Sequence, residues 1–231
     1  TMQLNQFVFE KSPLGNWEMN GVYMPGDNND HHIDGFITKD GVEVMKINGM
    51  YLRGEENKGS VNATVDLEHF PLDVINPFVP DNSLEFTGDF DGTLSMKGGP
   101  SKPLFNGNLA MDSVSLFMPE LSARFQFDNR PVQMVDSKMT FDQFKIFSKG
   151  KNPFMIDGYV NVSELSKINM NLGMRARNYE LINAPRTRRS IVYGKMYVDC
   201  DARLRGPLQE LVMRGNMNIL GKTNFTYIMK D

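Results

Sequence analysis

The sequence predicts a mainly β protein whose strands are apolar on one side. Three observations support this fold class. Apolar and polar residues alternate with a period of two, each alternating run ends at Gly, Pro, Asn or Asp, and helical spacing is scarce. Successive side chains of a strand point to opposite faces of a sheet, so this alternation gathers the apolar side chains on one face. We expect residues 1–231 to form a single domain with at most one or two short helices.

The clearest predicted strand runs from Leu84 to Met96, where Leu, Phe, Gly and Met alternate with Glu, Thr, Asp and Ser. One side of this strand is apolar with glycine gaps, and the other side is wholly polar. The same alternation returns in residues 168–176 and 196–204. Shorter versions occur at residues 61–67, 125–127 and 225–229. Runs of this kind predict roughly a dozen strands or more, all with the same construction.

Two segments have helical character. Residues 70–78 carry three apolar side chains at helical spacing, and Pro71 and Pro77 limit this helix to a turn or two. Residues 163–167 are a weaker second candidate.

The polar segment 25–34 and the basic segment 183–190 are predicted to be the longest loops. Neither separates two domains, because the strand pattern resumes on both sides. A weak internal repeat supports a continuous domain: residues 92–111 and 200–219 each read as a strand, a Gly-Pro turn, a short connector and a Gly-Asn pair opening a new strand. The two passages are expected to share a hairpin geometry.

The apolar face of such a sheet has no long helix to cover it. An open twisted sheet of this size rarely stays flat, so it must curl, close or fold over. A barrel, a sandwich and a long trough with an apolar lining would each bury that face. The periodicity alone leaves these three architectures open.

Composition excludes several classes of protein. Hydrophobic residues make up 40% of the chain and charged residues 23%, which is enough apolar material for a core. The net charge of −3 argues against a nucleic-acid binder, and the one cysteine excludes an internal disulfide. No signal peptide opens the chain and no apolar run is long enough for a membrane helix. We expect the chain to be a piece of a longer protein, whose membrane anchor would lie outside it.

No motif supports catalysis or a cofactor, and we expect this protein not to be an enzyme. The segment from Gly215 to Thr223 has five residues between its glycines, whereas a phosphate-binding loop has four and leads into a helix. Asp89 and Asp91 are spaced as in a calcium loop, but the alternation around them favours the wet face of a strand. Cys200 alternates with apolar neighbours, which indicates an inert buried thiol. A cluster with metal-ligating side chains is interpreted as a hydrated loop: Asp27, Asp30, His31, His32 and Asp34.

Arginines and methionines are the residues with a distinctive distribution. The one basic cluster comprises Arg175, Arg177, Arg186, Arg188 and Arg189. Such a run is usually a solvated surface, and the alternative is a contact of Arg186, Arg188 and Arg189 with anionic headgroups or an acidic partner. The 17 methionines lie mainly at inward strand positions, where they fill a core or provide an adaptable lining for ligands.

Residues 193–231, YGKMYVDCDARLRGPLQELVMRGNMNILGKTNFTYIMKD, resemble the C-terminal β-rich region of the TamB family, the AsmA-like translocation and assembly module. The shared pattern is an alternating strand, a Gly-Pro turn with an apolar connector, and then Gly-x-apolar and Gly-x-Thr strands. Residues 59–112 resemble the preceding part of that region, and the likeness covers most of residues 15–231. The loops at 25–34 and 186–189 do not match the family.

The resemblance implies a fold and a function. The fold would be one elongated, curled antiparallel sheet that forms a U-shaped, taco-like hydrophobic groove. The function would be that of a Gram-negative envelope segment in the periplasm, anchored in the inner membrane by another part of the protein. It would take part in phospholipid transfer between the inner and outer membranes or in outer-membrane protein assembly. The implied partners are phospholipid acyl chains, an outer-membrane barrel of the Omp85 kind and neighbouring segments of the same chain.

An apolar groove suits this role because transferring an acyl chain of about 16 carbons into water costs on the order of 12 kcal/mol of free energy. The residues expected to line the groove are the inward positions of the alternating strands: Leu84, Phe86, Phe90, Leu94, Met96, Leu109, Met111, Met170, Leu172, Met174, Met196, Val198, Leu204, Met217 and Ile219. Two other interpretations stay open. The first is a β-sandwich or β-helix binding module that recognises a surface glycan or protein, and the second is a purely structural spacer.

Overall fold

The computed structural model describes residues 1–9, 12–26, 30–53, 59–79, 84–99, 102–164, 167–186 and 191–228. These residues form 15 strands of one sheet and three short 3-10 helices, so the predicted mainly β fold is confirmed. The strands are β1 Met2–Phe9, β2 Ser12–Pro25, β3 Asp30–Lys39, β4 Val42–Leu52, β5 Ser60–Pro71, β6 Glu85–Gly98, β7 Leu104–Met118, β8 Ala123–Phe127, β9 Val132–Val135, β10 Lys138–Phe147, β11 Phe154–Asn161, β12 Asn169–Ala184, β13 Val192–Pro207, β14 Val212–Ile219 and β15 Asn224–Tyr227. The 3-10 helices are η2 Leu72–Phe78, η4 Pro119–Leu121 and η6 Leu208–Glu210.

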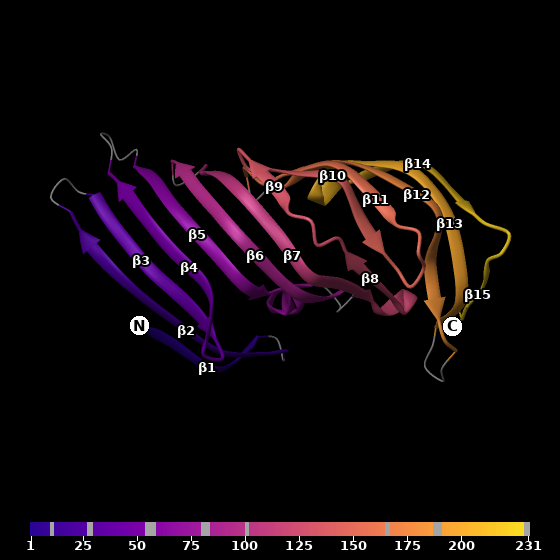
Figure 1. Ribbon diagram of the computed structural model, residues 1–231, viewed down its shortest axis with the longest axis horizontal. Helices are drawn as coiled ribbons and strands as arrows, with labels where there is room; N and C mark the ends of the chain where they lie inside the picture. Colours follow the sequence, from indigo (N-terminus) through magenta and orange to yellow (C-terminus); the bar gives the residue numbers. More distant parts are fainter. Residues whose placement is uncertain are drawn as a thin grey trace.

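The sheet is antiparallel and is built almost entirely from strands adjacent in sequence. The order is β1-β2-β3-β4-β5-β6-β7-β8-β10-β11-β12-β13-β14. Short β8 and β9 share the place between β7 and β10, and β15 pairs with β13 beyond the end of β14. In Figure 1, β1–β7 lie side by side as a broad twisted wall, and the strands that follow curl at the other end of the molecule.

The strand register assembles one continuous apolar face. Residues directly opposite each other in a ladder point to the same side of the sheet. One such row crosses nine strands through Ile47, Val65, Leu94, Gly107, Met134, Met139, Val160 and Met170 to Gly206. We call this side the inner face and the opposite side the outer face.

The curl brings distant parts of the inner face together. Ala123 and Phe125 of β8 pack in one buried cluster with Tyr179 of β12 and with Val198 and Cys200 of β13. Two strands, β10 and β11, separate β8 from β12 in the sheet. The sheet therefore bends until its inner faces meet, which confirms a curled sheet. A second cluster lies beside the first and includes Leu72, Met111, Val114, Val132 and Phe144.

The predicted short helix exists and ends at Phe78 as expected, but it begins two residues later than the spacing indicates. Phe70 and Pro71 belong to β5, and η2 begins at Leu72 with Pro77 inside it. The second candidate, at residues 163–167, lies partly outside the described residues.

The prediction of a loop over residues 25–34 is wrong. Strand β2 extends to Pro25 and β3 begins at Asp30, so His31 to Asp34 lie in a strand. Their polarity concealed an alternation, because His31 and Ile33 point inward while His32 and Asp34 point outward. The loop predicted at 183–190 is also shorter, since β12 continues to Ala184. Residues 27–29 and 187–190 lie outside the described part of the chain.

The two repeated passages form hairpins. Strand β6 pairs with β7 and β13 pairs with β14, each antiparallel. After Pro207 the chain enters η6 before β14 begins. Pro100 of the first passage lies outside the described residues.

Candidate functional site

The residues predicted to line a groove lie on the inner face wherever a strand pairing places them. This register holds for Phe86, Phe90, Leu94, Met96, Leu109, Met111, Met170, Leu172, Met174, Met196, Val198, Leu204, Met217 and Ile219. Leu84 precedes β6 and is half-buried. Sequence alternation therefore assigned the faces of β6, β7, β12, β13 and β14 in agreement with the register.

The inner face is packed in the middle of the sheet and open at both ends. Leu109, Met111 and Val198 are buried in the curled part, where side chains of facing strands cover one another. Met217 and Ile219 on β14 are 52% and 59% exposed. Large exposed side chains on the inner face of the terminal strands are Met2, Leu4, Met19, Tyr23, Ile33, Met213, Met217, Ile219, Phe225 and Tyr227. Unfilled apolar surface is thus concentrated at the two ends of the sheet.

The amino-terminal end of the inner face contains an apolar pocket of about 280 Å³. Trp17 lines it together with Leu4, Met19 and Ile37, and Val74 of η2 contributes to the wall. The indole N–H of Trp17 donates a hydrogen bond of 2.8 Å to the carbonyl oxygen of Leu14, which fixes the ring. The polar edge of Trp17 is therefore satisfied by the protein, and its apolar ring faces the pocket.

Five strands carry a bulge at which one residue adopts a left-handed backbone. These residues are Gln6 of β1, His69 of β5, Ser113 of β7, Gln143 of β10 and Asn178 of β12, with φ between 46° and 52°. A bulge inserts an extra residue into one strand and bends it, which increases the local twist. The bulges therefore help the sheet to curl.

A side chain from the neighbouring strand holds four of these bulges. Asp199 accepts a hydrogen bond of 2.7 Å from the backbone N–H of Asn178. In the same way, side-chain oxygens of Asn16, Asp91 and Asp157 accept hydrogen bonds of 2.8 Å from backbone N–H groups. The donors are Gln6, His69 and Gln143, respectively. The pKa of Asp157 is lowered, first because Arg175 donates a hydrogen bond to its carboxylate and also because of the Gln143 N–H.

Sequence reasoning missed these bulges, although a signal exists. Each one breaks the period of two with the order apolar, polar, polar, apolar, as in Phe141-Asp142-Gln143-Phe144 and Ala176-Arg177-Asn178-Tyr179. The second polar residue is the left-handed one in all five strands. An acceptor side chain one strand away, such as Asp157 or Asp199, completes the signal.

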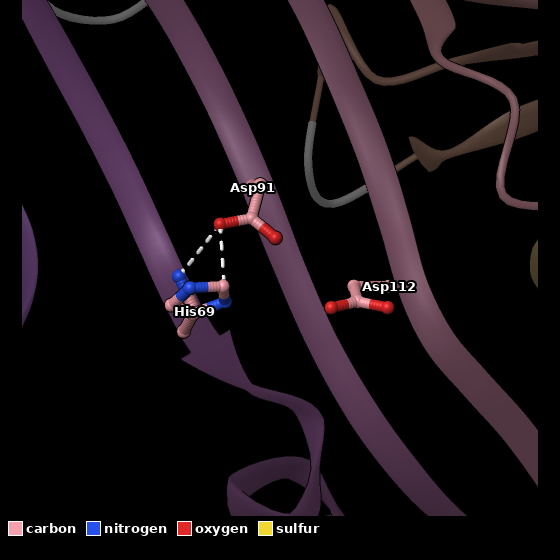
Figure 2. A group of neighbouring side chains, drawn as sticks. All are labelled: His69, Asp91 and Asp112. Atoms are coloured by element: carbon pink, nitrogen blue, oxygen red, sulfur yellow. Dashed lines mark hydrogen bonds and ion pairs between the residues drawn. The ribbon is translucent and has the colours of Figure 1, made fainter.

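One group of described side chains could hold a metal ion: His69, Asp91 and Asp112 on β5, β6 and β7 (Figure 2). Figure 2 shows the three side chains on one side of the sheet, with Asp91 turned toward His69. Asp91 already accepts a hydrogen bond from the backbone N–H of His69, as Asn16, Asp157 and Asp199 do from the bulge residues of the other three strands. Asp89 lies directly opposite Asp112, and its pKa is raised, mainly by burial. Holding the bulge therefore accounts for Asp91 without a metal.

The other residues with possible chemistry are dispersed. His31 points to the inner face, where its ring stacks between Tyr23 and Tyr51, whereas His32 points outward, so they do not converge on a metal site. Asp27 lies outside the described residues. Burial raises the pKa of the Cys200 thiol, which fits the expected inert cysteine. Arg186 is exposed, and its guanidinium lies 5.2 Å from the ring centre of Tyr193. Arg188 and Arg189 lie outside the described part.

Comparisons with protein-family models, with curated proteins and with solved structures found no significant match to this chain. Within the described residues, no helix has the length and apolarity needed to cross a membrane.

Proposed function

We propose that this chain is a non-enzymatic segment of a Gram-negative envelope protein, whose inner face carries phospholipid acyl chains through the periplasm. The observation that carries the proposal is the exposed apolar surface of the inner face at both ends of the sheet. A large exposed apolar surface on a soluble protein usually marks a binding surface. The proposal also rests on the resemblance of residues 193–231 to the TamB family.

The open ends of the inner face suit a flexible apolar ligand. Met2, Met19, Met213 and Met217 provide exposed thioether side chains, which adapt to ligands of varied shape. Each methylene of an acyl chain gains about 0.8 kcal/mol when it leaves water, so binding depends on the total apolar area and not on one residue. A headgroup would stay in water at the open side of the trough.

Two further partners belong to the proposal. Within the described residues, β1 pairs with β2 alone, and β14 and β15 pair with β13 alone. Each outer edge offers free backbone donors and acceptors, which a neighbouring segment of the same chain could pair with. The second partner is an outer-membrane barrel of the Omp85 kind, for which the support is the family resemblance. Outer-membrane protein assembly is the corresponding activity.

Lipid bound to the purified chain is the direct test. Native mass spectrometry and lipid extraction of the chain, produced in the periplasm of a Gram-negative host, should detect phospholipid. A photoactivatable phospholipid should crosslink to residues of the inner face. A chain that carries no lipid, takes up none from vesicles and instead binds a glycan would support the binding-module alternative.

Charged substitutions on the two faces make the test specific. Leu94→Asp and Leu172→Asp each place a carboxylate on the inner face, and both should abolish crosslinking. Gln133→Asp is the matched control, since Gln133 is exposed on the outer face of β9 and the change in charge is the same. The proposal fails if both inner-face variants fold, by circular dichroism, and crosslink as well as the control.

A further inference from the structure

The outer face of β11–β14 contains a hollow bordered by three arginines. Its volume is about 790 Å³, and Arg175, Arg203 and Arg214 are among its lining residues. Arg203 of β13 lies directly opposite Arg214 of β14 on one side and Gly173 of β12 on the other. Arg203 therefore has Arg214 on one side and a position without a side chain on the other, and Asp157 of β11 lies opposite Gly173 on its far side.

Two of these arginines carry positive charge that the described residues do not neutralise. Arg175 donates a hydrogen bond of 2.8 Å to the carboxylate of Asp157. The carboxylate of Asp201, which also borders the hollow, lies 3.8 Å from the guanidinium of Arg177. Arg203 and Arg214 form no ion pair with any residue that the structure describes. Like charges directly opposite each other on adjacent strands are destabilising. A bound anion would remove that repulsion.

The backbone does not require glycine at position 173. A Cβ atom added there would meet the carbonyl oxygen of Asp157 at 3.5 Å, which is an ordinary contact. At Gly158 and Gly215, which also border the hollow, a Cβ atom would overlap backbone atoms of the neighbouring strand. Any side chain at position 173 would extend into the space between the arginines, so its absence keeps the hollow open.

We infer that this hollow binds a phosphate ester. Guanidinium groups bind phosphate through paired, charge-assisted N–H···O bonds, and the contact with Asp157 holds Arg175 in place for this role. The phosphate would lie between Arg203 of β13 and Arg214 of β14, and the open position at Gly173 would leave room for it beside Arg203. The site is on the outer face, so it is independent of the proposed acyl groove.

Two probes distinguish the possible sources of the phosphate ester. Glycerol 3-phosphate, titrated by calorimetry, tests for a free solute. Cosedimentation with phosphatidylglycerol vesicles, compared with phosphatidylcholine vesicles, tests for a lipid headgroup. Binding of the soluble probe assigns a free phosphate ester, and binding to the anionic vesicles alone assigns a headgroup. Absence of binding to either probe overturns the inference.

Two site variants and one control test the location. Arg203→Gln with Arg214→Gln removes the charges, and Gly173→Leu fills the hollow without changing charge. Each should weaken binding about tenfold or more. Lys46→Gln with Lys97→Gln removes the same charge from exposed outer-face positions of β4 and β6, and should change binding little. Equal losses in this control, or normal binding by a folded Gly173→Leu variant, would show that charge alone attracts the probe and overturn the site.

Discussion

The carboxylate of Asp199 on β13 accepts a hydrogen bond of 2.7 Å from the backbone N–H of Asn178, the left-handed residue of the β12 bulge. The contact joins two neighbouring strands at the point where β12 bends. Three other bulges have the same arrangement, so it is a repeated device of this sheet.

Removing the acceptor at position 199 should destabilise the fold. Asp199→Ala leaves the Asn178 N–H without its partner and should lower the free energy of unfolding by about 1–2 kcal/mol. Asp199→Asn keeps a side-chain oxygen and should lower it less. Urea unfolding monitored by circular dichroism measures both changes. Equal losses in the two variants would show that the hydrogen bond contributes nothing.

The left-handed backbone at position 178 should select for particular residues. Asn178→Gly is expected to be tolerated, whereas Asn178→Val should lower the free energy of unfolding by about 1–2 kcal/mol, because a β-branched residue is strained there. Asn169→Val is the matched control at an exposed position of the same strand. Chemical denaturation of the three variants provides the comparison, and an Asn178→Val protein as stable as the Asn178→Gly protein contradicts the prediction.

The lowered pKa of Asp157 predicts a loss of stability in acid. A carboxyl group whose pKa is lower in the folded state stabilises the fold fully above the ordinary value of 3.8, and this contribution disappears as the pH falls through the lower, folded-state value. Between about pH 5.5 and about pH 2.5, the free energy of unfolding should therefore fall more in the unaltered protein than in Asp157→Asn. Denaturation curves at the two pH values test this. Parallel losses would mean that the ion pair with Arg175 is ineffective in solution.

Trp17 should report an acyl chain in the amino-terminal pocket. It is the one tryptophan of the sequence and lines the pocket with Met19 and Ile37. Phospholipid vesicles should shift its emission to shorter wavelength, and a brominated acyl chain should quench it, because the apolar ring faces the pocket. Glycerophosphocholine has a headgroup and no acyl chain, so it should leave the emission unchanged. Emission that changes neither with phospholipid vesicles nor with the brominated acyl chain would exclude acyl binding at the amino-terminal end of the inner face.

Much of the fold follows from the alternation of side chains. Leu94 and Leu172 were both expected to point inward, and register places them on the same face although β7, β8, β10 and β11 lie between β6 and β12 in the sheet. The signal is strong because one face is apolar and a shift of one residue would expose it. Alternation alone leaves a barrel, a sandwich and a curled trough open, and only the family resemblance favours the curled sheet among them.

Features that depend on a single backbone angle or on register were not predictable in the same way. The sequence Asp142-Gln143 contains no glycine, yet Gln143 adopts a left-handed backbone held by Asp157. Likewise, Arg203 and Arg214 lie on separate strands, and only the pairing of β13 with β14 sets them opposite each other. The polar residues on both faces of His31 to Asp34 hide its period of two, so the sequence predicts a loop where the structure has a strand.

The pairing of almost every strand with its predecessor has a consequence for evolution and folding. Contacts between consecutive strands close short loops, so the sheet can grow hairpin by hairpin without waiting for distant parts of the chain. Duplication or deletion of one hairpin would change the width of the sheet by two strands, about 10 Å, and preserve the direction of every other strand. Relatives of this chain could therefore differ in span through gain or loss of such units, as solenoid proteins differ in their number of repeats.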